Sequence, residues 1–156
     1  MLRSASIVLA RFSLALIFLL AGVQKILTWH ETETQLFQVL SDWITRVSYS
    51  DWATRVFGAL IPWTPFILMA ATLLELVGGL FVLLGFKEKL GAGLLILFLI
   101  PTTLIMHPFW YHDGLQSDLQ GIMFLKNLAI LGGLILVAVH GAQAKGGGGF
   151  SSFPMD

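Results

Sequence analysis

Residues 65–85 form an apolar segment with a single charged side chain, Glu75, at its centre. The segment reads PFILMAATLLELVGGLFVLLG. At a rise of about 1.5 Å per residue, a helix of this length crosses the hydrocarbon core of a bilayer. A charged side chain at the middle of a bilayer costs about 2.5 to 3.5 kcal/mol even on insertion scales. We therefore expect Glu75 to face the interior of a helix bundle and to meet a partner there.

The composition of the whole chain is typical of an integral membrane protein. Of its 156 residues, 56% are apolar and 12% are charged, which lies outside the range of soluble globular domains. The formal net charge is zero and no cluster of Lys and Arg occurs, so no nucleic-acid partner is expected. The chain has no cysteine, which excludes disulfides, thiol redox chemistry and iron–sulfur ligation by its own cysteines.

We predict an all-α membrane protein, a four-transmembrane-helix bundle with an amphipathic outer segment between its first and second helices. The alternative for the first apolar segment is a cleaved secretory signal, but Arg11 would interrupt its apolar region. A single membrane domain, residues 1–141, should be followed by a flexible glycine-rich tail, residues 142–156. The predicted spans are residues 6–27, 63–85, 90–106 and 119–140.

The outer segment, residues 28–61, is more polar than the spans and has a helical repeat of apolar side chains. Asp51 is a suitable N-cap for a second short helix within it. Pro62 and Pro65 suit the start of the second span, and Ser117 with Gln120 forms a capping-box pattern at the start of the fourth. We expect the outer helices to lie on the bundle or the lipid surface. Their first apolar stripe consists of Leu36, Phe37, Leu40, Trp43, Ile44 and Val47.

The distribution of charge predicts the orientation of the protein in its membrane. With four spans, both termini lie on the same side, and basic residues favour the cytoplasmic side. We therefore predict cytoplasmic N- and C-termini, with all five tryptophans at the opposite, outer interface. The basic residues on the predicted cytoplasmic side are Arg3, Lys87, Lys89 and Lys145.

Each predicted span carries polar residues on the same helical stripe as small residues. Because small residues let membrane helices approach closely, these stripes should face inward and bring their polar groups into one central cluster. From the helical rise, Glu75 lies near the midplane and the cluster opens toward the outer side. The expected members are Arg11, Lys25, Glu75, His107, Lys126 and Asn127.

The charges of this predicted cluster do not balance. Arg11, Lys25 and Lys126 share the bundle with a single acid, Glu75, which leaves an excess of about two positive charges in a medium of low dielectric constant. Three explanations remain open. The long side chains can snorkel to the headgroups, Lys126 can be neutral, or an anionic or electron-rich ligand can complete the set.

We expect no metal site in this cluster. His107 and His112 are five residues apart across a proline, which is not the geometry of a helical metal-binding pair. No Asp or Glu accompanies them at ligand spacing inside the membrane. His107 suits the end of a helix, and it can also relay protons at the outer mouth of the cluster.

Several sequence blocks on the four spans carry a family resemblance. They are Arg11 with GVQK at 22–25, LELVGG at 74–79, MHPFW at 106–110 and FLKNLAILGG at 124–133. Over residues 5–140 the chain resembles the DoxX family of small bacterial four-helix membrane proteins. The GVQK block adds Gln24 to the candidate site residues.

The resemblance implies an inner-membrane protein that is often associated with redox chemistry. Related members are subunits of a thiosulfate:quinone oxidoreductase or partners in oxidative-stress complexes. The absence of cysteine departs from relatives that are linked to disulfide formation.

Three functions are consistent with these observations. The first is an accessory or anchoring subunit of a membrane-associated redox complex, whose partners would be membrane lipids and other membrane or periplasmic subunits. The second is a quinone- or quinol-interacting oxidoreductase subunit, with quinone as a cofactor that is not covalently bound and a polar intramembrane pocket to receive it. The third, suggested by the excess of positive charge, is the binding or transport of a small anion or a lipid headgroup.

Overall fold

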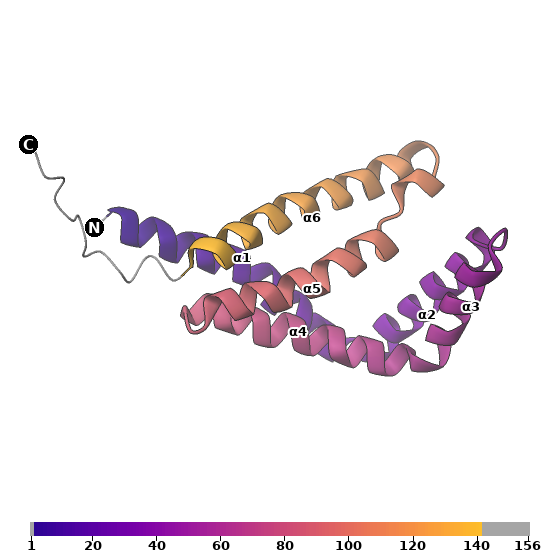
Figure 1. The fold of residues 1–156 in the computed structure, drawn as a ribbon, viewed down its shortest axis with the longest axis horizontal. Helices are drawn as coiled ribbons and strands as arrows, with labels where there is room; N and C mark the ends of the chain where they lie inside the picture. Colours follow the sequence, from indigo (N-terminus) through magenta and orange to yellow (C-terminus); the bar gives the residue numbers. More distant parts are fainter. Residues whose placement is uncertain (1, 142–156) are drawn as a thin grey trace, which may run out of the picture.

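The computed structural model describes residues 2–141 of the protein, and within that range it consists of helices without strands (Figure 1). Four of the described helices are long and apolar enough to cross a membrane, which confirms the prediction of an all-α membrane bundle. The predicted tail, residues 142–156, lies outside the described residues. In chain order the elements are α1 (Leu2–Leu27), α2 (Trp29–Arg46), α3 (Asp51–Leu60), η1 (Ile61–Trp63), α4 (Thr64–Leu84), α5 (Glu88–Met106), η2 (Phe109–Tyr111) and α6 (Gly114–His140).

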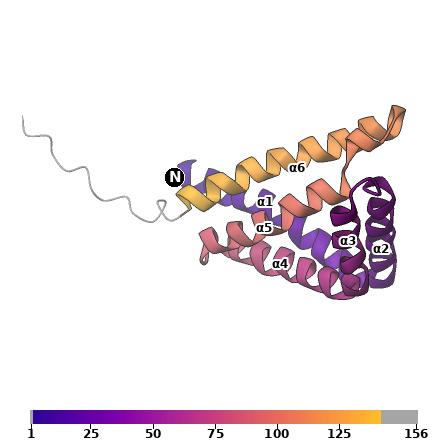
Figure 2. The ribbon, with the colours of Figure 1, turned by 45° about the vertical axis from the view of Figure 1, so that its right-hand side comes forward.

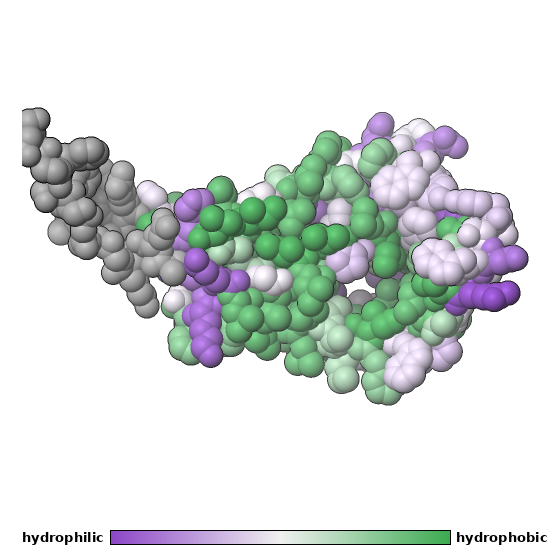
Figure 3. Space-filling model, in the orientation of Figure 1, coloured by the Kyte–Doolittle hydropathy of each residue, from purple (hydrophilic) through white to green (hydrophobic). Residues whose placement is uncertain are grey.

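The molecule has two distinct ends. The beginning of α1, the turn between α4 and α5 and the end of α6 lie together at what we call the terminal end (Figure 1). The helices α2 and α3 and the short helix η2 lie at the opposite, hairpin end (Figures 1 and 2). Apolar side chains cover the middle of the molecule, and polar side chains gather at both ends (Figure 3). This distribution suits a bilayer around the middle of the bundle.

The amphipathic outer segment packs against the bundle through Trp43 of α2. Its indole Nε1 donates a hydrogen bond to the backbone oxygen of Ile105, at 2.9 Å. Its ring stacks on Phe57 of α3 and meets Tyr111 of η2 edge-on, with centroid separations of 5.3 and 5.4 Å. Because an indole N–H needs a partner when it is buried, this bond fixes the α2–α3 pair against the end of α5.

The starts of α3, α5 and α6 differ from the sequence predictions in ways that have a physical reason. The cap of α3 is Ser50, whose extended backbone lets its Oγ accept a hydrogen bond from the backbone nitrogen of Ala53, so that Asp51 is already helical. Helix α5 begins at Glu88, two residues early, because the left-handed conformations of Gly85 (φ 64°) and Lys87 (φ 46°) complete the turn by then.

Helix α6 begins at Gly114 rather than at the predicted capping box. Ser117 lies inside the helix, where its Oγ donates to the backbone oxygen of Phe109 at 3.1 Å. Gln120 turns toward His107 rather than toward a helix cap. The pattern of residue types was therefore misread, because both side chains find partners outside their own helix.

The four long helices pack in sequence, α1 on α4, α4 on α5 and α5 on α6, whereas α1 and α6 have few contacts with each other. The buried core includes Ala15, Val82, Leu95 and Leu134. This core lies mainly in the half of the bundle next to the terminal end. In the other half, α1 and α6 do not pack on each other and leave an open seam between them. We call this the α1–α6 seam.

Helices α4 and α5 approach most closely at two glycines. A Cβ atom on Gly91 would lie 2.7 Å from the Cβ of Phe81 and 2.9 Å from the backbone oxygen of Gly78. Real Cβ atoms do not come this close to backbone, so position 91 needs glycine for the helices to keep their separation.

We expect Gly91→Ala to destabilise the protein although alanine is the better helix former. Forcing extra volume into a packed contact costs about 1–3 kcal/mol, which outweighs the gain in helix propensity of about 1 kcal/mol. Gly93→Ala is the matched control, because nothing lies within 4 Å of a Cβ atom at that position of the same helix. Thermal unfolding midpoints in detergent should fall for the first variant and not for the second. Equal midpoints would contradict the close contact.

Candidate functional site

The carboxylate at the centre of α4 is buried and paired. Glu75 is only 2% exposed, and its Oε2 accepts a hydrogen bond from Nζ of Lys25 on α1, at 2.7 Å. The ammonium group of Lys25 also lies 5.6 Å from the centroid of the Phe98 ring on α5. Lys25 therefore neutralises Glu75 while resting on an aromatic face, which is a favourable environment for a partly buried cation.

The ion pair borders a cavity of about 200 Å³ that we call the polar pocket. All four long helices contribute to it, and it lies on the α1–α6 seam. Phe18 and Phe98 form part of its wall and meet edge-on, with ring centroids 6.3 Å apart. Its polar lining residues are Lys25, Glu75, Thr102, His107, Lys126 and Asn127. Five of the seven candidate residues from the sequence thus line one cavity.

Two of these side chains are held by partners that the sequence did not reveal. Asn127 is buried, and its Nδ2 donates to Thr103 Oγ1 at 3.1 Å. Nδ1 of His107 lies 2.8 Å from Oε1 of Gln120, an amide oxygen that accepts a hydrogen bond. Thr103 shares the helical stripe of His107, and that was the available sequence signal. Gln120 had been assigned to a cap.

Lys126, another polar residue of the pocket, has only a weak side-chain partner among the described residues. Its side chain is exposed, and its Nζ lies 3.5 Å from the sulfur of Met123, a weak acceptor. Within residues 2–141, both ion pairs that the structure forms use other cations, so Lys126 has no carboxylate partner there. Lys126 therefore lies at the α1–α6 seam with N–H donors that no carboxylate of residues 2–141 uses.

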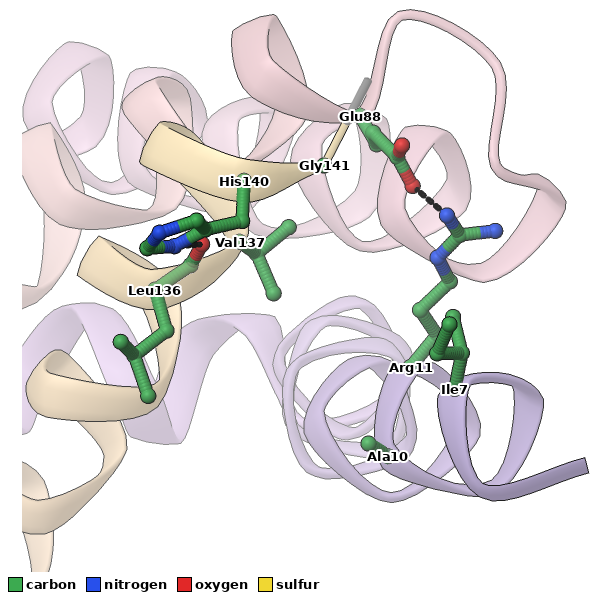
Figure 4. A pocket seen from close by; sticks show the side chains of 8 residues that line it. All are labelled: Ile7, Ala10, Arg11, Glu88, Leu136, Val137, His140 and Gly141. Carbon is green, nitrogen blue, oxygen red and sulfur yellow. Dashed lines mark hydrogen bonds and ion pairs between the residues drawn. The ribbon is translucent and has the colours of Figure 1, made fainter. Parts of the chain in front are cut away.

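The structure places two of the candidate residues, Arg11 and Gln24, outside the polar pocket. Arg11 lies fourteen residues before Lys25 on α1, which corresponds to roughly 21 Å along the helix axis. It pairs with Glu88 at the start of α5, in a separate cavity of about 330 Å³ at the terminal end that His140 also lines (Figure 4). Gln24 is exposed and does not line either cavity.

The pairing of Arg11 depends on the turn between α4 and α5. Glu88 is only 7% exposed. A Cβ atom on Gly85 would lie 2.6 Å from Nη1 of Arg11, so the absence of a side chain there makes room for the guanidinium. With this pair formed, the described membrane region has one unpaired cation, Lys126, instead of the two that the sequence suggested.

In the described part of the chain, no three His, Asp or Glu side chains gather in a group that could hold a metal ion. The chemistry that the polar pocket offers is hydrogen bonding and proton exchange. Lys25, Lys126 and His107 are its basic groups, and Glu75 is its acid.

Comparison with known proteins decides the family. The family described as DoxX matches residues 6–108, which cover most of the chain and include Lys25, Glu75 and His107. This chain belongs to the DoxX family. The matched region of this DoxX protein ends before α6, so Lys126 and Asn127 lie beyond it.

Two relatives of this DoxX protein are Escherichia coli proteins of similar length. Inner membrane protein YqjF is 29% identical over 92% of this chain and 89% of its own length. Inner membrane protein YphA is 25% identical over 91% of this chain and 87% of its own length. The yeast ER-derived vesicles protein ERV29 is 30% identical over a shorter stretch, 44% of this chain and 22% of its own length. No solved structure matches the DoxX chain.

The Lys25–Glu75 pair should be energetically coupled. We expect Lys25→Met to lower the free energy of unfolding by about 3–5 kcal/mol, because it leaves the buried Glu75 without its partner, and Glu75→Leu to cost less, because Lys25 is only partly buried. The double variant should cost much less than the sum of the two, since no buried charge remains. Unfolding of the four proteins in detergent micelles measures this cycle. Additive single effects would show that the two groups are independent.

Proposed function

We propose that this DoxX protein binds the headgroup of a membrane-soluble quinone or quinol in the polar pocket and acts as a membrane subunit of a redox complex. The observation that carries the proposal is Lys126, a cation on the membrane seam without an acidic partner among residues 2–141, close to a buried acid–base pair. This supports the ligand-binding alternative from the sequence over a purely anchoring role.

The lining of the pocket suits a quinone ring. Quinones supply carbonyl oxygens that accept hydrogen bonds and take up protons on reduction. Lys126 and Lys25 can donate to such oxygens, while Phe18 and Phe98 offer aromatic surface to the ring. Glu75 and His107 are titratable groups at the same pocket and can exchange protons with the ligand. The seam between α1 and α6 lets a lipid-dissolved molecule enter from the side.

The chain contains no cysteine, so thiol or iron–sulfur electron carriers would belong to a partner subunit. A partner can meet the protein at the hairpin end, where Tyr49 and Trp52 are 82% and 75% exposed. Exposed aromatic side chains of this kind are common both in protein interfaces and at membrane surfaces.

Binding of decylubiquinone and a menaquinone analogue to the purified protein tests the proposal. We expect Lys126→Met and Glu75→Gln to weaken binding at least tenfold, because the first removes a donor to the ring and the second removes the titratable carboxylate that holds Lys25 at the pocket. Lys89→Met is the matched control, since Lys89 is an exposed lysine at the terminal end and lines no pocket described here. Affinities are measured by calorimetry at constant detergent concentration.

Three results would count against the proposal. Absence of quinone binding to the wild-type protein rejects the ligand. Displacement of the quinone by an anionic phospholipid, with equal loss of both in Lys126→Met, favours the lipid-headgroup alternative. Purification of the wild-type chain from native membranes in mild detergent without any second protein rejects the role as a subunit.

We further propose that the protein lies in a bacterial inner membrane with the terminal end in the cytoplasm. The Escherichia coli relatives are named inner membrane proteins. Lys87 lies in the turn at the terminal end and Lys89 in the first turn of α5, as the preference for positive charge on the cytoplasmic side requires. The five tryptophans fall in α2, α3, η1 and η2 at the hairpin end, which suits the outer interface.

Reporter fusions test this orientation. Alkaline phosphatase inserted after Tyr49, in the loop between α2 and α3, should be active because that loop would face the periplasm. The same enzyme fused after Gly141 should be inactive, and a fluorescent protein at that position should fold and fluoresce. The reverse pattern of activities would overturn the assignment of the two ends.

A further inference from the structure

A third cavity, distinct from the one that Arg11 and Glu88 line, borders the polar pocket on the side of α2. It has a volume of about 330 Å³ and lies between α2, α4 and α5 in the half of the bundle next to the hairpin end. The hollow right of centre in Figure 3 lies where these three helices meet in Figure 1. We call it the apolar cavity, because hydrocarbon side chains dominate its wall, among them Leu36, Ile67, Ala71, Leu97 and Ile105.

The two cavities share part of their wall. Lys25, Phe98 and Thr102 line both of them. Lys25 contacts Glu75 and lies over the ring of Phe98, so the polar end of the apolar cavity is also an edge of the polar pocket. A molecule held at Lys25 therefore lies directly beside a hydrocarbon-lined space.

The volume of the polar pocket limits what it can hold. Pockets that enclose drug-sized ligands measure about 300–1,000 Å³, and the polar pocket measures about 200 Å³. A single substituted ring fits this space, whereas a ring with a long hydrocarbon chain does not. The chain of such a ligand must leave the polar pocket, either into the surrounding lipid through the α1–α6 seam or into the apolar cavity.

The apolar cavity is the better place for the chain. Transfer from lipid to a protein cavity brings little hydrophobic gain, because lipid tails are as apolar as leucine. The cavity walls gain dispersion contacts when a chain fills them, and a chain that is tethered to a bound headgroup enters at a high effective concentration. A free lipid tail lacks this second advantage.

We propose that the apolar cavity between α2, α4 and α5 binds the hydrocarbon chain of the ligand whose ring occupies the polar pocket. This inference rests on the proposed function and adds a ligand class to it. The ligand is an amphiphile with a hydrogen-bond-accepting ring and a hydrocarbon or isoprenoid chain, and both parts are recognised. Lys25, Phe98 and Thr102 are the residues at the junction of ring and chain.

The test compares the affinities of two ligands with the same ring, decylubiquinone and the corresponding ring without its chain. Ligand amounts are expressed as molecules per detergent micelle. Wild-type protein should bind decylubiquinone at least tenfold more tightly than the chainless ring. Ala71→Leu narrows the apolar cavity and should remove most of this difference while binding of the chainless ring stays unchanged. Ala129→Leu is the matched control, because Ala129 is exposed on α6 and lines neither cavity.

A second variant guards against misfolding, since Ala71 packs against the core. Leu97→Trp enlarges a side chain that is 63% exposed at the cavity rim, and it should have the same selective effect. A decylubiquinone analogue with a photoreactive group at the end of its chain should label wild-type residues of α2, α4 or α5 around the apolar cavity. Mass spectrometry of the labelled peptides identifies them.

The outcomes separate this inference from the proposed function. Equal affinities of the two ligands for the wild-type protein, or labelling confined to α1 and α6, would overturn the chain site while the ring site stands. The same holds if both cavity variants bind decylubiquinone normally while Lys126→Met does not. Binding of neither ligand by the wild-type protein would overturn both proposals.

Discussion

The ion pair between Lys25 and Glu75 determines how the bundle is arranged. A carboxylate at the centre of a membrane-spanning helix must be buried and paired, and the packing of α1 on α4 meets both needs here. Gly22 makes this possible, because a Cβ atom there would lie 2.7 Å from the side chain of Leu76. Since α1 packs on α4 and α6 packs on α5, α1 and α6 have few contacts with each other. The polar pocket lies on the seam that this leaves.

The structure changes the meaning of the charge excess in the sequence. Arg11 is satisfied by Glu88 and serves to hold α1 against the turn between α4 and α5. Lys25 is satisfied by Glu75. What remains in the described membrane region is a single lysine, and it stands at the pocket rather than at random on the lipid surface. One unpaired donor beside an internal salt bridge is a more specific indication of a ligand than a diffuse excess of positive charge.

Much of the fold and part of the site were predictable from the sequence, for identifiable reasons. Hydrocarbon length sets the spans, so α1, α4, α5 and α6 follow from apolar runs alone. The need of Glu75 for an interior partner and the helical stripes bring Lys25, His107, Lys126 and Asn127 to the same place. Periodicity shows which residues share a helix face, but it does not show which residues along the lengths of two packed helices lie opposite each other.

The errors come from that missing information. Arg11 and Glu88 meet only because Gly85 and Lys87 end α4 in a tight left-handed turn that places the start of α5 beside α1. Gln120 had a plausible local role in a cap, and only the path of the chain through η2 brings it to His107. Phe98 carried no signal at all, because one aromatic residue in an apolar helix looks like any other. Its importance comes from lying between two cavities.

The weak contact between α1 and α6 determines the phase from which the proposed ligand arrives. A site that opens sideways into hydrocarbon exchanges its contents with the bilayer and not with water. Its occupancy is then governed by the mole fraction of the ligand among the lipids, and its competitors are acyl chains. Such a site can stay filled with only modest intrinsic affinity, because a ligand confined to the membrane diffuses in two dimensions and is always locally concentrated.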